Sequence, residues 1–267
     1  MEVKTETKKA EDEKKVYRMR FDMPQAELRA VFDFFKKALN KTVLFYVSED
    51  GVRIAAYDFA KIAVGVVYIN KGCMKNYNVS NNHTFALDLD SLKGSLILLK
   101  DRQAMLSFIQ NEDEITVTSG DGFTKTVSVS DELVEVRVPE IKYESGGVVD
   151  SHDFYAAVNM AADMNDLIKL TGDGSNLVVS AYRDDKKKLA IEAPLKLKGG
   201  KFNGEMTTMP SDYLKNATAS LKNFELMVRM KKAGVDKMVQ PVKINFKKAV
   251  LNGELKGYIM IAPMREQ

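Results

Sequence analysis

The feature that most constrains this 267-residue chain is a pattern of structural elements that occurs twice. In residues 23–69, an apolar stripe at helical spacing precedes short segments in which apolar and polar side chains alternate. Residues 150–193 repeat this order with little identity to the first copy. A repeated order of elements predicts two structurally similar halves. Each half is expected to run helix, strands, helix, strands.

The first half is predicted to begin at Val16, where VYRMRF alternates as a half-buried strand does. Met23 and Pro24 then open a helix, because proline is tolerated in a first helical turn. The apolar face of that helix comprises Leu28, Val31, Phe32, Phe35 and Leu39. Short strands are predicted over residues 42–47, 52–57, 61–69, 104–109, 115–119 and 123–129.

Two further helices are predicted from capping and spacing. The segment LDLDSLKGSLILLK, residues 87–100, favours a helix with Asp88 or Asp90 as its N-cap. Its counterpart in the second half is MPSDYLKNATASL, residues 209–221. With the helix that begins near Asp150, the chain is expected to carry two helices in each half.

Composition and charge narrow the class of protein. With 45% hydrophobic and 29% charged residues, the chain is typical of a globular protein. The apolar runs are too short for a membrane span and the N-terminus lacks a signal-peptide core, so we expect an intracellular protein. The single cysteine, Cys73, excludes an internal disulfide and a multi-cysteine metal site. A net charge of +3 does not by itself identify a nucleic-acid binder.

Domain boundaries follow from local composition. Residues 1–15 are dense in Lys and Glu and are expected to form a charged flexible tail. Residues 130–147, SDELVEVRVPEIKYESGG, contain one proline and a Gly-Gly pair, which favour an extended crossing segment. We therefore expect an N-terminal domain at 16–129, an interdomain connector at 130–147 and a C-terminal domain at 148–267.

Three motifs in the same order resemble those of the PCNA-type DNA sliding clamps. DGVRIAAYDFAKIAVGVVYI resembles the family's Gly-hydrophobic strand, its Met/Tyr-Asp-x-x-His/Lys turn and its next strand. In EVRVPEIKY, Pro139 and Glu140 occupy the place where the clamps' connector ends in Pro-Glu. QPVKINFKKAVLNGELKGYIMIAP resembles their final hairpin. The resemblance runs from about Val16 to Pro263.

This resemblance implies an α+β duplicated sliding-clamp fold, with two similar domains that each carry antiparallel sheets and two helices on one face. It implies a DNA polymerase processivity factor, a ring that encircles duplex DNA, with no catalytic site and no cofactor. Ring closure needs two exposed sheet edges, which the resemblance places at residues 122–129 and 188–197. Their head-to-tail pairing would give a trimer.

The helices of such a ring line its hole and hold phosphates without reading bases. The residues expected to face DNA are Arg29, Lys36, Lys37, Lys41, Lys93, Lys100, Lys215 and Lys222. On a single helix these would be ordinary solvated side chains; the duplicated fold favours the DNA-facing interpretation. The helix from Asp150 to Met164 departs from the family, because its His152, Tyr155, Ala156 and Asn159 make it nearly neutral.

The family's partners insert a short Gln-x-x-aliphatic-x-x-aromatic-aromatic motif, the PIP-type motif, into an apolar pocket beneath the connector. The matching positions are Tyr57, Val136, Val138, Pro139, Pro241, Met260, Ile261, Ala262 and Pro263. For Val136 and Ile261 a plain core role is equally compatible with the sequence. The implied partners are a clamp loader, and a DNA polymerase, ligase and flap nuclease that carry this motif.

Other classes of function find less support. His83 and His152 lie in no recognisable nucleophile or metal motif, and Lys198-Gly199-Gly200-Lys201 lacks the ending of a phosphate loop and is expected to be a flexible turn. Asp88 and Asp90 could suggest a metal site, but helix capping explains them more simply.

A closer alternative to a DNA sliding clamp is a clamp-like subunit of a checkpoint or transcription complex that assembles with unlike chains. A second is a protein-interaction scaffold that never encircles DNA. The cellular site would be the nucleus for a eukaryotic or viral chain and the cytoplasm for an archaeal one.

Overall fold

The computed structural model describes residues 17–92, 104–120, 122–130, 135–183, 188–231 and 241–263. Its first half contains β1 (Met19–Pro24), α2 (Gln25–Ala38), β2 (Thr42–Ser48), β3 (Gly51–Tyr57), β4 (Ala63–Asn70), the short 3-10 helix η1 (Lys71–Cys73), β5 (Lys75–Val79), β6 (His83–Asp88), β7 (Met105–Gln110), β8 (Glu114–Ser119) and β9 (Thr124–Ser128). Its second half contains β10 (Ser145–Val149), α3 (Ser151–Ala162), β11 (Leu167–Gly174), β12 (Asn176–Arg183), β13 (Lys188–Lys196), β14 (Gly199–Pro210), α4 (Ser211–Ser220), β15 (Glu225–Met230), β16 (Val242–Val250) and β17 (Gly253–Ile261).

The strands form two antiparallel sheets. A five-stranded sheet has the order β5-β1-β7-β8-β9, and a twelve-stranded sheet has the order β13-β12-β11-β14-β10-β15-β16-β17-β4-β3-β2-β6. The long sheet passes from one half to the other where β17 pairs with β4, with Tyr258 opposite Val66. The two halves are therefore joined by main-chain hydrogen bonds as well as by the connector.

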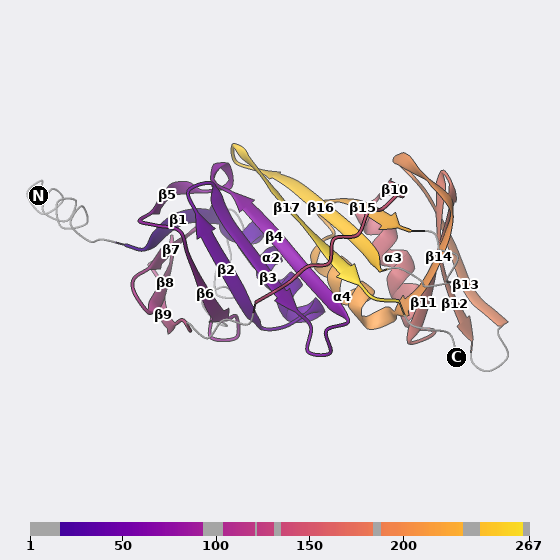
Figure 1. Cartoon of the computed structure of the whole chain (residues 1–267), viewed down its shortest axis with the longest axis horizontal. Helices are drawn as coiled ribbons and strands as arrows, with labels where there is room; N and C mark the ends of the chain where they lie inside the picture. The colour runs from indigo at the N-terminus through magenta and orange to yellow at the C-terminus, as the bar shows by residue number, and fades with distance from the viewer. Residues whose placement is uncertain are drawn as a thin grey trace, which may run out of the picture.

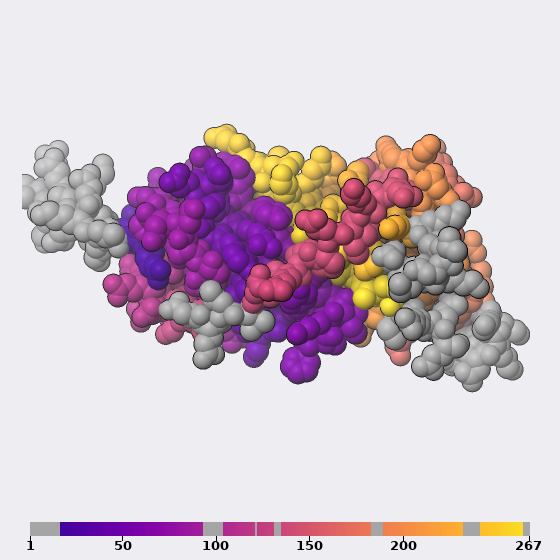
Figure 2. All heavy atoms as spheres, viewed as in Figure 1, coloured from indigo at the N-terminus to yellow at the C-terminus, as the bar shows by residue number. Residues whose placement is uncertain are grey.

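The three described α-helices lie on the same side of the long sheet (Figure 1). Helix α4 contacts both α2 and α3, so the helices of the two halves form one continuous layer. Residues 135–144 cross the opposite face of the sheet, which is called the outer face below (Figures 1 and 2). None of the described helices is long and apolar enough to cross a membrane.

A large apolar core fills the space between the helices and the sheets. Phe34 of α2 meets Phe246 of β16 edge to face, with ring centroids 5.2 Å apart, which ties a first-half helix to a second-half strand. Phe108 stacks on Phe21 at 5.0 Å and on Phe45 at 6.2 Å, so the short sheet packs onto the long one through aromatic side chains. Cys73 is buried in the same core, and burial raises its thiol pKa to about 11, which makes it an unreactive structural thiol.

Several predicted boundaries need correction. Met23 and Pro24 end strand β1 rather than opening the helix, which begins at Gln25. Residues 87 and 88 end strand β6, so the helix predicted from residue 87 does not begin there, and its part from residue 93 lies outside the described residues. Strands β5 and β6 were not anticipated.

The two glycine pairs expected to be linker or turn are strand residues. Gly146 and Gly147 lie in β10, opposite Lys201 and Gly200 of β14, so the extended crossing segment ends before β10. Gly200 has φ +82°, and a Cβ there would lie 2.2 Å from the carbonyl oxygen of Gly146. Only glycine permits this approach of β14 to β10.

Candidate functional site

The helical layer carries the basic residues that the sequence places against DNA. On α2, Arg29 and Lys37 are exposed and share one carboxylate, with Arg29 Nε 3.9 Å and Lys37 Nζ 3.6 Å from Oδ2 of Asp33. Both pairs span one helical turn at the surface, where such contacts stabilise by about 0.5 kcal/mol or less. The two cations can therefore exchange Asp33 for a phosphate at little cost.

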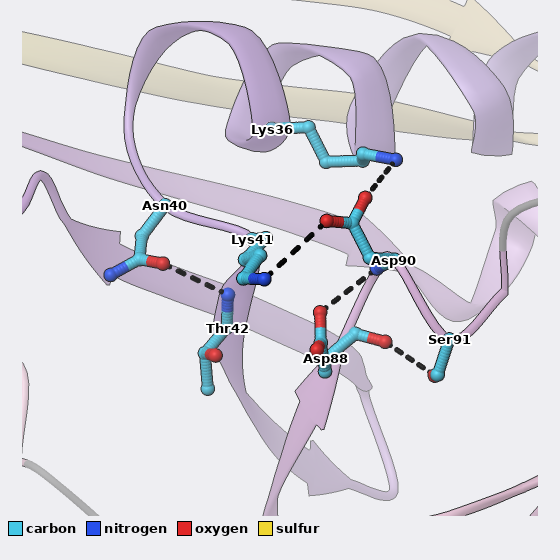
Figure 3. A network of polar contacts seen from close by, with 7 residues as sticks. All are labelled: Lys36, Asn40, Lys41, Thr42, Asp88, Asp90 and Ser91. Atoms are coloured by element: carbon cyan, nitrogen blue, oxygen red, sulfur yellow. Dashed lines mark hydrogen bonds and ion pairs between the residues drawn. The ribbon is translucent and has the colours of Figure 1, made fainter.

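At the end of α2, two lysines converge on a single aspartate (Figure 3). Lys36 Nζ lies 2.6 Å from Oδ1 of Asp90, and Lys41 Nζ lies 3.6 Å from its Oδ2. The hydrogen bond from Lys36 is the largest cause that lowers the Asp90 pKa, so this carboxylate remains ionised. Asp88 closes the preceding turn, because its Oδ1 accepts the Asp90 backbone N–H at 2.9 Å. Asp90 therefore partly neutralises the positive charges of Lys36 on α2 and of Lys41 just after it.

The second half contributes less positive charge to this layer. Lys215 of α4 pairs with Asp163 at the end of α3 at 2.9 Å, and that hydrogen bond raises the Lys215 pKa. Lys222 Nζ sits 3.6 Å from the ring centroid of Tyr155. Residues 151–164 contain no Lys or Arg, and Met160 and Met164 are 46% and 52% exposed. The face of α3 therefore offers apolar surface where a phosphate-binding face would carry cations.

Six of the eight predicted DNA-facing residues lie within the described part of the chain, and all six are on the helices or in the segments that follow them. Lys93 and Lys100 lie outside the described residues. The six described cations contact three aspartates and one tyrosine ring. Glu27, Asp153 and Asp212 lie on the same helices, so six carboxylates balance the six cations of the layer. The phosphate interactions that this layer can make are weak and independent of sequence.

On the outer face, the connector covers a second apolar cluster. Val136 and Val138 pack onto Val64, Val66 and Met260, together with other side chains of the sheet. The hydroxyl of Tyr57 donates a hydrogen bond to the carbonyl oxygen of Arg137. Four of the predicted pocket residues, Tyr57, Val136, Val138 and Met260, are thereby brought together.

The other predicted pocket residues divide into three groups. Pro139 is exposed on the connector. Pro241, Ala262 and Pro263 are half-buried at the ends of β16 and β17, and the Ala262 N–H donates to the Ile62 carbonyl at 2.9 Å. Ile261 is fully buried in the helix-side core, so its assignment to the pocket is wrong. The alternation of side chains along a strand sends Met260 outward and Ile261 inward.

Phe59 is a further candidate contact residue that the sequence pattern does not mark. It is 97% exposed in the turn between β3 and β4, two residues after Tyr57 in the sequence. Asp58 holds this turn, with Oδ1 accepting the Ala63 N–H at 2.6 Å and Oδ2 accepting the Ala60 N–H at 3.0 Å. An aromatic side chain in a fixed turn is a typical anchor for a binding partner. No periodicity marks it, because Phe59 belongs to neither strand.

The sheet edges are where the sequence placed them. Strand β9 is an edge of the five-stranded sheet and β13 is an edge of the twelve-stranded sheet. The two strands lie toward opposite ends of the elongated molecule (Figure 1). Each presents backbone groups on which another chain can add a strand.

Comparison with known proteins agrees with this architecture. The family model for the N-terminal domain of proliferating cell nuclear antigen matches residues 17–141. A DNA polymerase sliding clamp of Methanococcus maripaludis is 25% identical over 162 residues, which cover 56% of this chain and 64% of that protein. A DNA polymerase sliding clamp of Thermoplasma volcanium is 21% identical over 171 residues, covering 63% of this chain and 68% of that protein. The match thus spans just under two thirds of the Methanococcus relative.

Solved structures resemble nearly the whole described fold. Archaeoglobus fulgidus PCNA bound to the C-terminal region of FEN-1 superposes with a TM-score of 0.77 at 20% identity, covering 93% of this chain and 99% of that one. PCNA of Entamoeba histolytica gives a TM-score of 0.80 at 13% identity, covering 94% and 100%. The fold, with its helical layer and with edge strands β9 and β13 toward opposite ends, is that of a sliding clamp. Residues 17–141 match the N-terminal domain of the PCNA-type clamps, and the described chain as a whole has the fold of these clamps.

Proposed function

We propose that this chain is a DNA polymerase processivity factor that encircles duplex DNA as a trimeric ring and has no catalytic site. The observation that carries the proposal is that two of the four edge strands, β9 and β13, lie toward opposite ends of a molecule whose described helices share one face. Head-to-tail pairing of unlike edges closes into a ring when the rotation suits, and then places the helices on the inside. The basic residues of α2 and α4 would face the DNA there.

The proposal includes the division of the chain into clamp domains at 16–129 and 148–267, a connector at 130–147 and a tail at 1–15. The partners proposed are a clamp loader, and a polymerase, ligase and flap nuclease that insert a PIP-type motif beneath the connector. The clustering of Tyr57, Val136, Val138 and Met260 supports this pocket. The Archaeoglobus relative, described as bound to the C-terminal region of FEN-1, supports the nuclease. The work of such a ring is intracellular, in the nucleus of a eukaryotic or virus-infected cell or the cytoplasm of an archaeal one.

A comparison of retention on circular and on linear DNA tests whether the chain encircles DNA. The purified chain, a clamp loader and ATP are mixed with nicked circular DNA, and the protein retained on the DNA is measured by gel filtration. We expect retention on the circle, its loss when the DNA is linearised, and stimulation of a polymerase by the loaded chain. Equal retention on circular and linear DNA would instead identify a scaffold that binds DNA without encircling it.

A second candidate is a protomer of a mixed ring, specialised for checkpoint or transcription work. The absence of Lys and Arg from residues 151–164 favours it, since unlike chains in the ring could supply the missing charge. One structural relative is described as a PCNA2–PCNA3 complex from Sulfolobus tokodaii, with a TM-score of 0.78. Light scattering of the pure chain separates the two candidates. A mass about three times the 29.9 kDa of one chain supports the homotrimer, and a monomer supports the mixed ring.

A further inference from the structure

The outer face of the long sheet carries a hollowed surface that the proposed clamp function does not use. We call it the tyrosine groove, after Tyr46, Tyr68 and Tyr258, which project from β2, β4 and β17. It comprises two adjoining hollows that share Tyr68, Glu254 and Lys256. Tyr46 and Tyr258 also pack against the cluster beneath the connector, so the groove is continuous with the proposed peptide pocket.

Cations lie over the rings of the groove. The Arg53 guanidinium carbon is 4.6 Å from the centroid of the Tyr46 ring, and Lys243 Nζ is 3.9 Å from that of Tyr258. Arg229, exposed on β15, donates from Nε to the sulfur of Met227 at 3.4 Å. Among the described residues, none of these three cations has a carboxylate within ion-pair distance.

The carboxylates of the groove are already paired. Glu225 lies 3.1 Å from Lys247, and Glu254 lies 3.9 Å from Lys256. Asp50, at the rim, lies 3.9 Å from Lys71. Arg53 and Arg229 line the groove, and Lys243 lies over the ring of its Tyr258, so these three cations give the groove an excess of positive charge. Burial, and then the nearby Arg229, lowers the Lys243 pKa, so the charge of Lys243 carries an energetic cost that a bound anion would relieve.

The floor also contains hydrogen-bond donors without acceptors. Arg53 Nε and Asn245 Nδ2 are buried and have no partner among the described residues. Donors held in this way cost free energy until an acceptor arrives. Tyrosine rings beneath cations, with unused N–H groups beside them, form a surface suited to carboxylate oxygens on an extended chain.

We propose that the tyrosine groove binds an acidic peptide segment of a partner protein, whose Asp or Glu side chains reach Arg53, Arg229 and Lys243. A peptide fits better than a nucleic acid, because Asp50, Glu225 and Glu254 interrupt the positive surface. A peptide places separate carboxylates between those acids, whereas a continuous phosphate backbone would meet them. This inference concerns the face opposite the helices and is independent of ring closure.

The test measures the anisotropy of a short fluorescein-labelled peptide in which Glu alternates with Ser. We expect salt-sensitive binding, and little binding of the same peptide with Gln in place of Glu. The triple variant Arg53→Gln, Arg229→Gln, Lys243→Gln should weaken binding by about tenfold or more, because three cationic contacts are lost. The single variant Arg229→Gln changes only an exposed side chain and should show a smaller loss, with an unchanged thermal melt.

The matched control is Lys169→Gln. Lys169 on β11 also lies over a tyrosine, 5.6 Å from the ring centroid of Tyr182, but outside the groove. This variant removes one positive charge, as Arg229→Gln does, and should leave the anisotropy unchanged. An equal loss in the control, no binding of the Glu-Ser peptide, or equally tight binding of a short oligothymidylate would each overturn the proposal. Binding of a PIP-type peptide to the triple variant, measured in parallel, reports on the connector pocket separately.

Discussion

The hydroxyl of Tyr213 donates a 2.6 Å hydrogen bond to Oδ2 of Asp58, and this contact joins α4 of the second half to the β3–β4 turn of the first. Asp58 is only 4% exposed, and its carboxylate also accepts the N–H groups of Ala60 and Ala63. Burial, followed by the bond to Asp58, raises the Tyr213 pKa to about 12. The turn that carries Phe59 is therefore positioned by both halves.

This arrangement predicts an ordered loss of stability. Asp58→Ala removes the acceptor of three hydrogen bonds and should lower the free energy of unfolding by about 2 kcal/mol. Tyr213→Phe removes one of the three and should cost about 1 kcal/mol. Urea denaturation followed by circular dichroism measures both. Asp50→Ala, at an aspartate whose side chain is 94% exposed, is the control and should change little; an equal loss there would contradict the role of Asp58.

Phe59 is predicted to contribute to partner binding without contributing to the fold. Because its ring is almost fully exposed, Phe59→Ala should leave the melting temperature unchanged. If the ring packs against a peptide inserted beneath the connector, the variant should weaken a PIP-type peptide by about tenfold, as an aromatic anchor does. Isothermal titration calorimetry measures the affinity. Leu251→Ala, at an exposed apolar residue between β16 and β17, should bind like the unmodified chain.

The sequence predicts those helices and strands whose apolar residues recur at a regular local spacing. Helix α2 and strands β2 to β4 were found because their apolar spacing is strict. Gly146 and Gly147 were assigned to a linker, because their strand pairing depends on β14, more than fifty residues away along the chain. The ion pair between Lys36 and Asp90 was equally invisible, since it joins residues that only the tertiary fold brings together.

The error at Ile261 has a different physical origin. The long sheet is covered on one face by helices and, where the connector crosses it, on the other face by the connector. Both Met260 and Ile261 are therefore apolar and buried, at 3% and 0% exposure. Strand alternation identifies a face only when one face is polar. In β17 the sequence shows that consecutive side chains point to opposite faces, but it cannot show which of the two meets the pocket.

Helix α3 offers a test of stability against pH. Asp150 caps the helix, with its side chain accepting the His152 N–H at 2.9 Å and the Asp153 N–H at 3.1 Å. The hydrogen bond from Lys198 is the largest cause that lowers the Asp150 pKa from 3.8 to about 2. A depressed pKa means that the unfolded chain binds the proton more tightly. The stability from Asp150 is therefore complete above about pH 4 and is lost as the pH falls towards 2.

Asp150→Ala should lower the free energy of unfolding by about 1 kcal/mol at neutral pH. The variant should also flatten the dependence of stability on pH in the window from about 4 to 2. Lys198→Gln keeps the cap but removes its charged partner, so it should move the acid limb towards higher pH. Urea denaturation at a series of pH values measures both effects. An acid limb that is identical in all three proteins would show that Asp150 titrates normally.

The weakly charged α3 face gives the last prediction. Met160 is 46% exposed on α3, and Met160→Lys should add one cation to each protomer of the lining. Each new phosphate contact should steepen the fall of log affinity with log salt by about 0.9. Lys37→Gln on α2 should shift the salt dependence the other way. Retention of the ring on nicked circular DNA, measured over a salt series, reports the change.

The control for Met160→Lys is Met206→Lys, which adds the same charge at a 52% exposed methionine on β14, outside the helical layer, and should leave retention unaltered. If Met206→Lys strengthens retention as much as Met160→Lys, the helical layer is not the surface that faces DNA.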